Sequence, residues 1–178
     1  LGVPAETIAE ALGTLQNVPG RFEHVDAGQN FQVIVDYAHT DDGLRNVLNA
    51  ARGICDGRLI VVFGCGGDRD KTKRPKMGAV AAQLGDFAIV TSDNPRSEDP
   101  ERILLDIEVG LQHAGKQKYD DYETILDRTE AIRRAIGMAK AGDAIMIAGK
   151  GHEDYQILGN TRIHFDDREV ARAILTEG

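Results

Sequence analysis

The sequence predicts an α/β fold: a doubly wound, mostly parallel sheet with helices on both faces, followed by a C-terminal hairpin. Four apolar runs rich in β-branched residues alternate with stretches of helical length and periodicity. Each run is apolar throughout rather than at every second position, which is typical of parallel strands covered on both faces. Regular alternation of strand and helix is the pattern from which doubly wound sheets are built.

The predicted elements follow in order along the chain. A short helix over residues 4–15 ends at the Asn-Val-Pro-Gly turn of 17–20, and the compact domain is expected to begin near Phe31. The expected strands are 32–35, 59–63, 87–90 and 144–147, with a weaker one around 118–122. The expected helices are 42–52, 75–84, 100–111 and 128–140, with a last one over 167–175. The runs 155–158 and 161–164 flank Gly159-Asn160, which predicts a hairpin.

Composition excludes several classes of protein. The 178 residues carry 21 Lys and Arg against 29 Asp and Glu, a formal net charge of −8, so a general nucleic-acid binder is disfavoured. No apolar run approaches the roughly 18 residues that a membrane-spanning helix needs. Two cysteines are too few for a disulfide scaffold and favour a reducing compartment. The histidines have no metal-ligand spacing, so no metal site is expected.

Polar segments follow all four clear strands, at residues 36–40, 64–70, 91–96 and 149–153. The carboxyl ends of parallel strands share one edge of the sheet, and ligands bind at that edge. Ordinary connections need one or two turn residues, not four clusters of charge, glycine and histidine. The sequence therefore predicts a ligand site there.

The segment 64–70 combines glycines with basic residues. Glycines let backbone amides approach a ligand closely, although a tight strand-to-helix turn is the alternative interpretation. The segment is neither a Walker A loop nor a dinucleotide fingerprint, because both patterns require a glycine five residues after the first one, and no glycine stands at that distance from Gly64. Five cations near a helix start are electrostatically unfavourable and therefore favour an anionic ligand. They are Arg69, Lys71, Lys73, Arg74 and Lys76.

The tetrapeptide 93–96 offers both charges that a free amino acid requires. Pro95 fixes its own φ and biases Asn94 towards an extended conformation. Arg96 presents a planar fork for a carboxylate, and Asp93 or Asn94 can receive an ammonium group. The alternative is an Asx-type turn that caps the next helix while Arg96 is solvated.

The other two segments are less specific. Asp36 and His39 can hold nucleotide hydroxyls or a base edge, while a helix cap from Thr40 or Asp41 is the alternative. Gly151 follows Lys150 where a phosphate loop would have Ser or Thr, so metal-linked phosphate binding is not indicated. Glu153 is a candidate acceptor for a ligand ammonium. A single histidine such as His152 is more often structural than catalytic, so no catalytic role is assigned to it.

Five motifs together resemble the C-terminal part of the Mur ligase family, in the same order and over essentially the whole chain. They are VPGRFE at 18–23, DYAHT at 36–40, GCGGDRDKTKRPKM at 64–77, TSDNPR at 91–96 and GKGHEDYQ at 149–156. The resemblance implies an ATP-dependent ligase of cytoplasmic peptidoglycan synthesis. In it, ATP phosphorylates the glutamate carboxyl of UDP-N-acetylmuramoyl-L-Ala-D-Glu, and the amine of an incoming amino acid attacks the acyl phosphate.

Carried over motif by motif, the resemblance implies a binding site for meso-diaminopimelate, for which the sequence DNPR is the family's mark. Arg69 and Arg96 would hold a carboxylate of that amino acid. The residues that would receive its ammonium or line the pocket are Asp93, Asn94, Pro95, Gly149 and Glu153. Arg21, Asp36 and His39 match positions near the nucleotide, whereas Lys73 and Arg74 would face phosphate groups or solvent.

The resemblance also implies a division of the chain. Residues 1–20 are expected to be the tail of a central ATP-binding domain with its hinge, and 21–178 the third domain. The family's Gly-Lys-Thr loop, its Mg²⁺ ligands and its UDP-sugar domain would lie outside, so no catalytic residue and no metal ligand is assigned here. The chain alone is expected not to ligate and to need the remaining domains as partners. The alternatives are a related ligase such as a folylpolyglutamate synthase, or a non-catalytic amino-acid-binding module.

Overall fold

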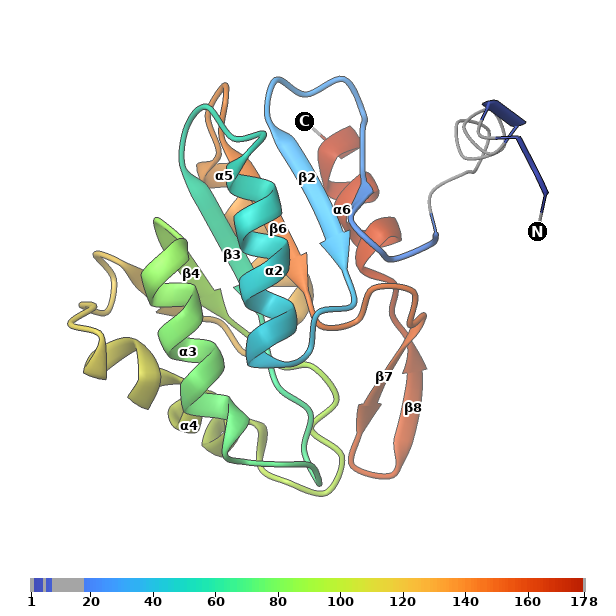
Figure 1. Cartoon of the computed structure of the whole chain (residues 1–178). Coiled ribbons are helices and arrows are strands. Elements are labelled where there is room, and N and C mark those ends of the chain that lie inside the picture. The colour runs from blue at the N-terminus through green and yellow to red at the C-terminus, as the bar shows by residue number, and fades with distance from the viewer. Residues whose placement is uncertain (1, 5, 8–17, 178) are drawn as a thin grey trace.

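The centre of the computed structural model is a six-stranded sheet, and the model describes residues 2–4, 6–7 and 18–177 (Figure 1). The sheet strands are β1 (Glu23–His24), β2 (Gln32–Asp36), β3 (Leu59–Phe63), β4 (Phe87–Val90), β5 (Tyr122–Thr124) and β6 (Ala144–Ala148). Their order is β1-β2-β6-β3-β4-β5, with β1 antiparallel to β2 and every other pairing parallel. The predicted sheet is therefore confirmed, with β6 inserted between β2 and β3.

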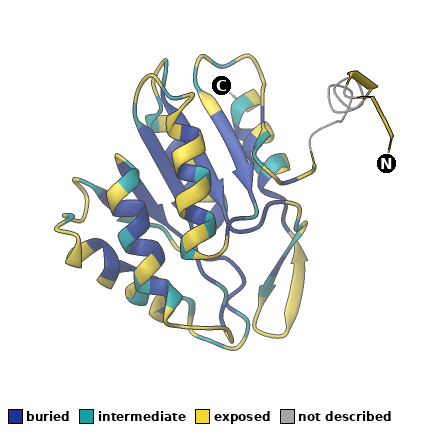
Figure 2. Ribbon diagram, viewed as in Figure 1, coloured by how far each residue is buried: buried dark blue, intermediate teal, exposed yellow. Residues whose placement is uncertain are grey.

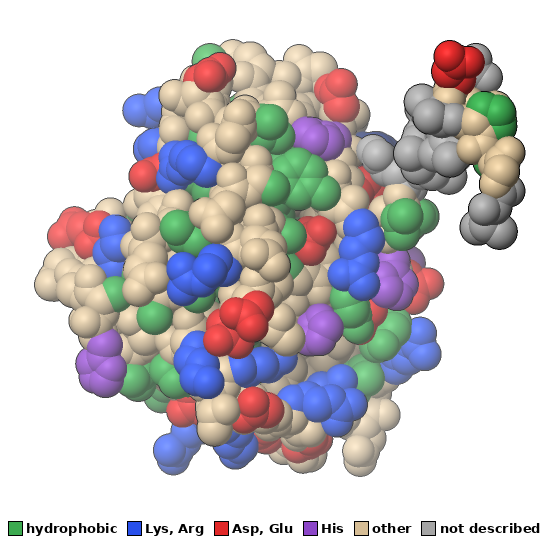
Figure 3. Space-filling model, viewed as in Figure 1, with side chains coloured by type: hydrophobic (Ala, Val, Ile, Leu, Met, Phe, Trp, Pro, Cys, Tyr) green, Lys and Arg blue, Asp and Glu red, His purple; other side chains and the backbone are tan. Residues whose placement is uncertain are grey.

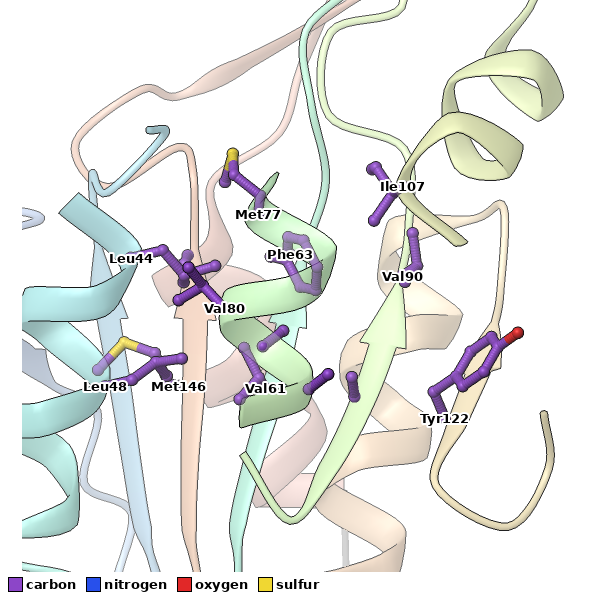
Figure 4. Close-up of a cluster of buried hydrophobic side chains, with 14 of the residues drawn as sticks. Leu44, Leu48, Val61, Phe63, Met77, Val80, Val90, Ile107, Tyr122 and Met146 are labelled. Atoms are coloured by element: carbon purple, nitrogen blue, oxygen red, sulfur yellow. The ribbon is translucent and has the colours of Figure 1, made fainter. Parts of the chain in front are cut away.

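Helices cover both faces of the sheet. The described helices are α2 (Asp41–Arg52), α3 (Lys73–Leu84), α4 (Pro100–His113), α5 (Arg128–Met138) and α6 (Asp167–Glu177). Side chains of α2, α3 and α4 form one core cluster with alternate strand residues such as Val61 and Phe63 (Figure 4). Helices α5 and α6 pack with the intervening residues Ile60 and Val62 on the opposite face. Because every residue of β3 is buried, the strand shows no apolar–polar alternation (Figure 2).

Local chemistry fixes where the helices begin. The Thr40 hydroxyl accepts a hydrogen bond from the Gly43 amide, so the predicted cap at α2 is confirmed. Asp99 caps α4 and is followed by Pro100, whose missing amide proton costs nothing at the first helical position. Asp127 caps α5 in the same way. No helix among the described residues has the length and apolar character needed to cross a membrane.

A second, two-stranded sheet is the predicted hairpin, formed by β7 (Tyr155–Leu158) and β8 (Thr161–His164). Gly159 takes a positive φ of 59° at its turn, as the Gly-Asn pair suggested. The hairpin lies beyond the carboxyl end of β6, beside the loops at the lower edge of the sheet in Figure 1. It therefore forms a wall next to the edge predicted to bind a ligand.

Two differences from the sequence prediction concern where a strand and the domain begin. Residues 117–121 form a turn closed by the Asp121 amide on the Gln117 carbonyl, so the fifth strand begins at Tyr122 rather than near Lys118. The domain begins before Phe31, because β1 pairs with β2 and Val25 is buried. The predicted helix at 4–15 lies mostly outside the described residues.

Candidate functional site

Four adjacent strands, β2, β6, β3 and β4, deliver their following loops to one edge of the sheet. The loops and the start of the hairpin enclose a cavity of about 520 Å³. In Figure 3, basic and acidic side chains are mixed over the lower part of the molecule, where Figure 1 shows these loops. The lining residues are Tyr37, His39, Thr40, Gly66, Arg69, Asp70, Lys73, Asp93, Asn94, Arg96, Gly149, Glu153 and Tyr155.

The glycines after β3 allow this loop to pack directly on the segment after β4. A Cβ at Gly64 would stand 2.2 Å from the Thr91 carbonyl oxygen, and one at Gly67 would stand 1.9 Å from that of Pro95. The Gly67 amide also donates to the Asn94 carbonyl at 2.9 Å. Gly64 and Gly67 therefore allow loop-on-loop packing, a role that the sequence analysis did not consider.

Two arginines lie on the cationic side of the cavity. Arg96 has a φ of 53°, unusual for a residue with a side chain, and its amide is held by the Ile157 carbonyl at 3.1 Å. Its Nη1 donates to the Gly67 carbonyl at 2.7 Å, and no described residue bonds its Nε or Nη2. Arg69 is exposed, with Nη1 on the Asp68 carbonyl at 3.0 Å. Both guanidinium groups keep donors available for an anionic group in the cavity.

The acidic side of the cavity is built around a buried amide. Asn94 Nδ2 donates to Glu153 Oε2 at 3.0 Å, and its Oδ1 accepts from the Lys150 ammonium and the Ile157 amide, each at 3.0 Å. The Asn94 amide thus has its principal bonds inside the protein. Asp70, Asp93 and Glu153 are the carboxylates that line the cavity, and Asp93 lies 3.2 Å from the Lys150 ammonium. No Asx-type cap forms here, because Asp99 caps α4.

The basic cluster after β3 does not act as one anion site. Arg74 is almost fully buried and bonds Glu98 and Asp106, so it faces neither phosphate nor solvent. Lys71 also pairs with Glu98 at 3.0 Å. Hydrogen bonds, the first of them from Arg74, lower the pKa of Glu98 to about 2. The carboxylates that neutralise these cations come from beyond β4, which the local charge count did not reveal.

Residues at the end of β2 and just after it anchor the chain that leads into β1 and form an aromatic cluster around Tyr37. Asp36 is buried, and its two carboxylate oxygens accept from the Phe22 and Ala38 amides at 2.8 and 2.7 Å. Arg21 stacks 4.6 Å from the centre of the Tyr37 ring, and the rings of His39 and Tyr37 meet edge to face. The structure therefore gives Asp36 an anchoring contact, while Arg21 and His39 remain exposed.

The predicted site residues separate into two groups in space. Those that line the cavity together are His39, Arg69, Asp93, Asn94, Arg96, Gly149 and Glu153. Pro95, Arg21 and Asp36 do not line it. The sequence argument missed Tyr37 and Tyr155, although both stand inside motifs it used. No group of three or more His, Cys, Asp or Glu among the described residues is placed to hold a metal ion.

Comparison with known proteins gives consistent relatives. Residues 20–151 match the family model described as "Mur ligase, glutamate ligase domain". The chain is 58% identical, over 99% of its length, to the UDP-N-acetylmuramoyl-L-alanyl-D-glutamate–2,6-diaminopimelate ligase of Trichormus variabilis, and equally to that of Geobacillus kaustophilus. A solved structure of a ligase of the same name superposes with a TM-score of 0.82 at 39% identity over 99% of the chain.

The chain spans about a third of these relatives, 35% of each. The family model covers most of the chain, including the segments after β2, β3 and β4 that surround the cavity and the first residues after β6. The fold and its ordered motifs agree with this match. The chain belongs to the Mur ligase family, of which it carries the glutamate ligase domain.

Proposed function

We propose that this chain is the amino-acid-accepting domain of an ATP-dependent ligase. The complete protein joins meso-diaminopimelate to UDP-N-acetylmuramoyl-L-Ala-D-Glu in cytoplasmic peptidoglycan synthesis. Residues 21–178 form the C-terminal domain, and 1–20 belong to the end of the preceding domain and its hinge. The named ligases that share more than half of the chain's residues support this assignment.

The observation that carries the proposal is the division of charge inside the cavity. All four charged residues line the cavity: Arg69 and Arg96 both lie within 4 Å of the position that a Cβ at Gly66 would take, whereas Asp93 and Glu153 both lie within 4.0 Å of the Lys150 ammonium. An amino-acid centre carries a carboxylate and an ammonium, which are complementary to these two pairs. Diaminopimelate has two such centres, so one can be held here while the amine of the other reacts. Asn94 and Gly149 line the same cavity, whereas Pro95 lies behind the lining, where its carbonyl packs against Gly67.

The nucleotide would approach from the segment after β2. Arg21 and His39 are exposed on either side of the Tyr37 ring, where a guanidinium and aromatic surfaces suit a phosphate and a base. Asp36 supports them indirectly, by holding the Phe22 amide. No magnesium ligand is assigned to the described residues, and ATP would bring its metal to the remaining domains.

Calorimetric titration of the complete protein, loaded with a non-hydrolysable ATP analogue and the UDP substrate, tests the proposal. We expect meso-diaminopimelate to bind and lysine, which lacks the second carboxylate, to bind at least about 30-fold more weakly, as for a lost buried charge contact of about 2 kcal/mol. Arg96→Ala should raise the KM for diaminopimelate by a similar factor.

Arg52→Ala is the matched control. Arg52 pairs with Asp86 on an exposed part of the surface, away from the loops of the cavity, so its loss should leave that KM unchanged. Equal affinity for lysine, or an unchanged KM in Arg96→Ala, would refute the proposed specificity. Absence of ATP turnover with any amino acid would refute the proposed activity itself.

A further inference from the structure

A fully buried lysine stands behind the acidic wall of the cavity. The Lys150 side chain has 0% exposure. Its ammonium lies 2.7 Å from the Tyr155 carbonyl, 3.0 Å from Asn94 Oδ1 and 3.2 Å from Asp93 Oδ1. The first two oxygens accept hydrogen bonds from the ammonium, and Asp93 Oδ1 is its nearest counter-charge. Because the lysine side chain is fully buried, its effect on a ligand must pass through the residues that it holds.

The contact with Asn94 determines which way the amide faces. Oδ1 accepts from the Lys150 ammonium and from the Ile157 amide, and both groups are donors only. A reversed amide would point its own NH₂ at these two donors. Asn94 must therefore present Nδ2 on the other side, where it donates to Glu153 Oε2 at 3.0 Å.

Glu153 receives this hydrogen bond at the wall of the cavity. Its side chain is 18% exposed, and no described residue bonds its second oxygen, Oε1. The Lys150 ammonium is 4.0 Å from Oε2, too far for a hydrogen bond but close enough to attract the carboxylate. Lys150 thus acts on Glu153 twice, through the amide and through its charge.

The surrounding charges explain why the lysine must be a cation here. The two carboxylates Asp93 and Glu153 face it, whereas the neighbouring buried pair Arg128 and Asp167 is neutral as a unit. Burial lowers the pKa of Lys150, and the charge of Asp93 opposes that shift. Without the ammonium, the buried Oδ1 of Asp93, which accepts no directed hydrogen bond in this structure, would lose its counter-charge.

We propose that Lys150 is a positioning residue that fixes the Asn94 amide and thereby aims Glu153 at the ammonium group of the amino-acid substrate. This inference rests on the proposed function and concerns the same cavity. It assigns to the lysine of the GKGHE segment a role in amino-acid recognition, although its side chain never reaches the substrate. Its loss should therefore weaken amino-acid binding without changing how the other two substrates bind.

The test is Lys150→Met in the complete protein, with steady-state KM values for amino acid, ATP and the UDP substrate. We expect the KM for the amino acid to rise about 10- to 100-fold, because Glu153 loses both the amide orientation that aims it and the charge that attracts it. The other two KM values should stay within about twofold. Arg58→Met is the matched control, because it also removes a cation from a buried carboxylate, Asp143, at the opposite edge of the sheet. It should lower stability without changing any KM.

A second pair of variants tests the connection to Glu153. Asn94→Asp keeps the oxygen that Lys150 and Ile157 bond but replaces the donor to Glu153 with a second oxygen, so it should also raise the amino-acid KM. If Lys150 acts through Glu153, then Lys150→Met combined with Glu153→Gln should raise that KM no further than the larger single effect. This prediction holds for whichever amino acid the wild type uses.

The two proposals fail in distinguishable ways. A wild-type protein that uses another amino acid would overturn the proposed substrate, while the response of Lys150→Met would still decide the role of the lysine. Equal rises in all three KM values, multiplicative effects in the double variant, or an unchanged KM in Asn94→Asp would overturn the positioning role. If Lys150→Met does not fold, Asn94→Asp alone still decides it.

Discussion

The buried ion pair between α5 and α6 allows a quantitative prediction. Arg128 Nε and Nη2 each lie 2.8 Å from an oxygen of Asp167, and both side chains have 0% exposure. We expect Asp167→Asn to lower the free energy of unfolding by about 3–5 kcal/mol, because the change leaves a guanidinium buried without a counter-charge. Asparagine keeps one oxygen, so one charge-assisted hydrogen bond of about 1.5–3 kcal/mol is lost and the other is weakened, which is consistent with this magnitude.

Replacing the whole pair should have a much smaller effect. Arg128→Met combined with Asp167→Leu removes both charges, together with the Nη1 atom that is buried without a partner. Such replacements are often neutral or stabilising, so the double variant should unfold within about 1 kcal/mol of the wild type. The double variant still loses the hydrogen bond from Arg128 Nη2 to the Ala148 carbonyl, which is the remaining destabilising contribution.

Urea unfolding followed by far-UV circular dichroism is the appropriate assay, since the chain contains no Trp. The midpoint and the slope should both be reported, because a changed slope would mean that the unfolded state differs between variants. A cost below about 1 kcal/mol for Asp167→Asn would refute this reasoning. A double variant as unstable as the single one would refute it equally.

Three further outcomes are expected. The pKa of Glu98 is depressed to about 2, so its ion pairs stabilise the fold fully above the ordinary carboxyl pKa of about 4.5. That stability is lost as the pH falls from about 4.5 towards 2. Glu98→Gln should therefore make the urea midpoint less dependent on pH over this range. Gly67→Ala should destabilise by about 1–3 kcal/mol, because a methyl group would collide with the neighbouring loop. Its control is Gly137→Ala in α5, where the added Cβ has no neighbouring atom within 4 Å. This variant should raise the free energy of unfolding by up to about 1 kcal/mol in the same titration. Burial raises the pKa of Cys65 to about 12, so mass spectrometry after iodoacetamide at pH 8 should find Cys55 alkylated and Cys65 intact.

The sheet could be predicted because its strands are short, continuously apolar segments whose burial does not depend on distant partners. The fifth strand was displaced because Tyr122–Thr124 has a single buried residue, and a turn at 117–121 precedes it. The two residues of β1 are too few for any periodicity to detect.

The cavity could be located but not described in detail from the sequence. Parallel strands end at the same edge of a sheet whatever their order, so the convergence of the loops was predictable. Arg74 was misinterpreted because its partners Glu98 and Asp106 are 24 and 32 residues away. Lys150 offered no local signal for its burial, because its contact with Asn94 spans 56 residues.

The strand order also has a consequence for how the chain folds. Strand β6 separates β2 from β3, so the two earlier strands cannot join in their final arrangement until residues near 144 are available. Contacts between distant parts of the sequence slow folding, because loop closure must precede the favourable interactions. During synthesis, roughly the first four-fifths of the domain would therefore wait with unpaired strand edges until β6, which begins at Ala144, leaves the ribosome. In this period aggregation competes with folding.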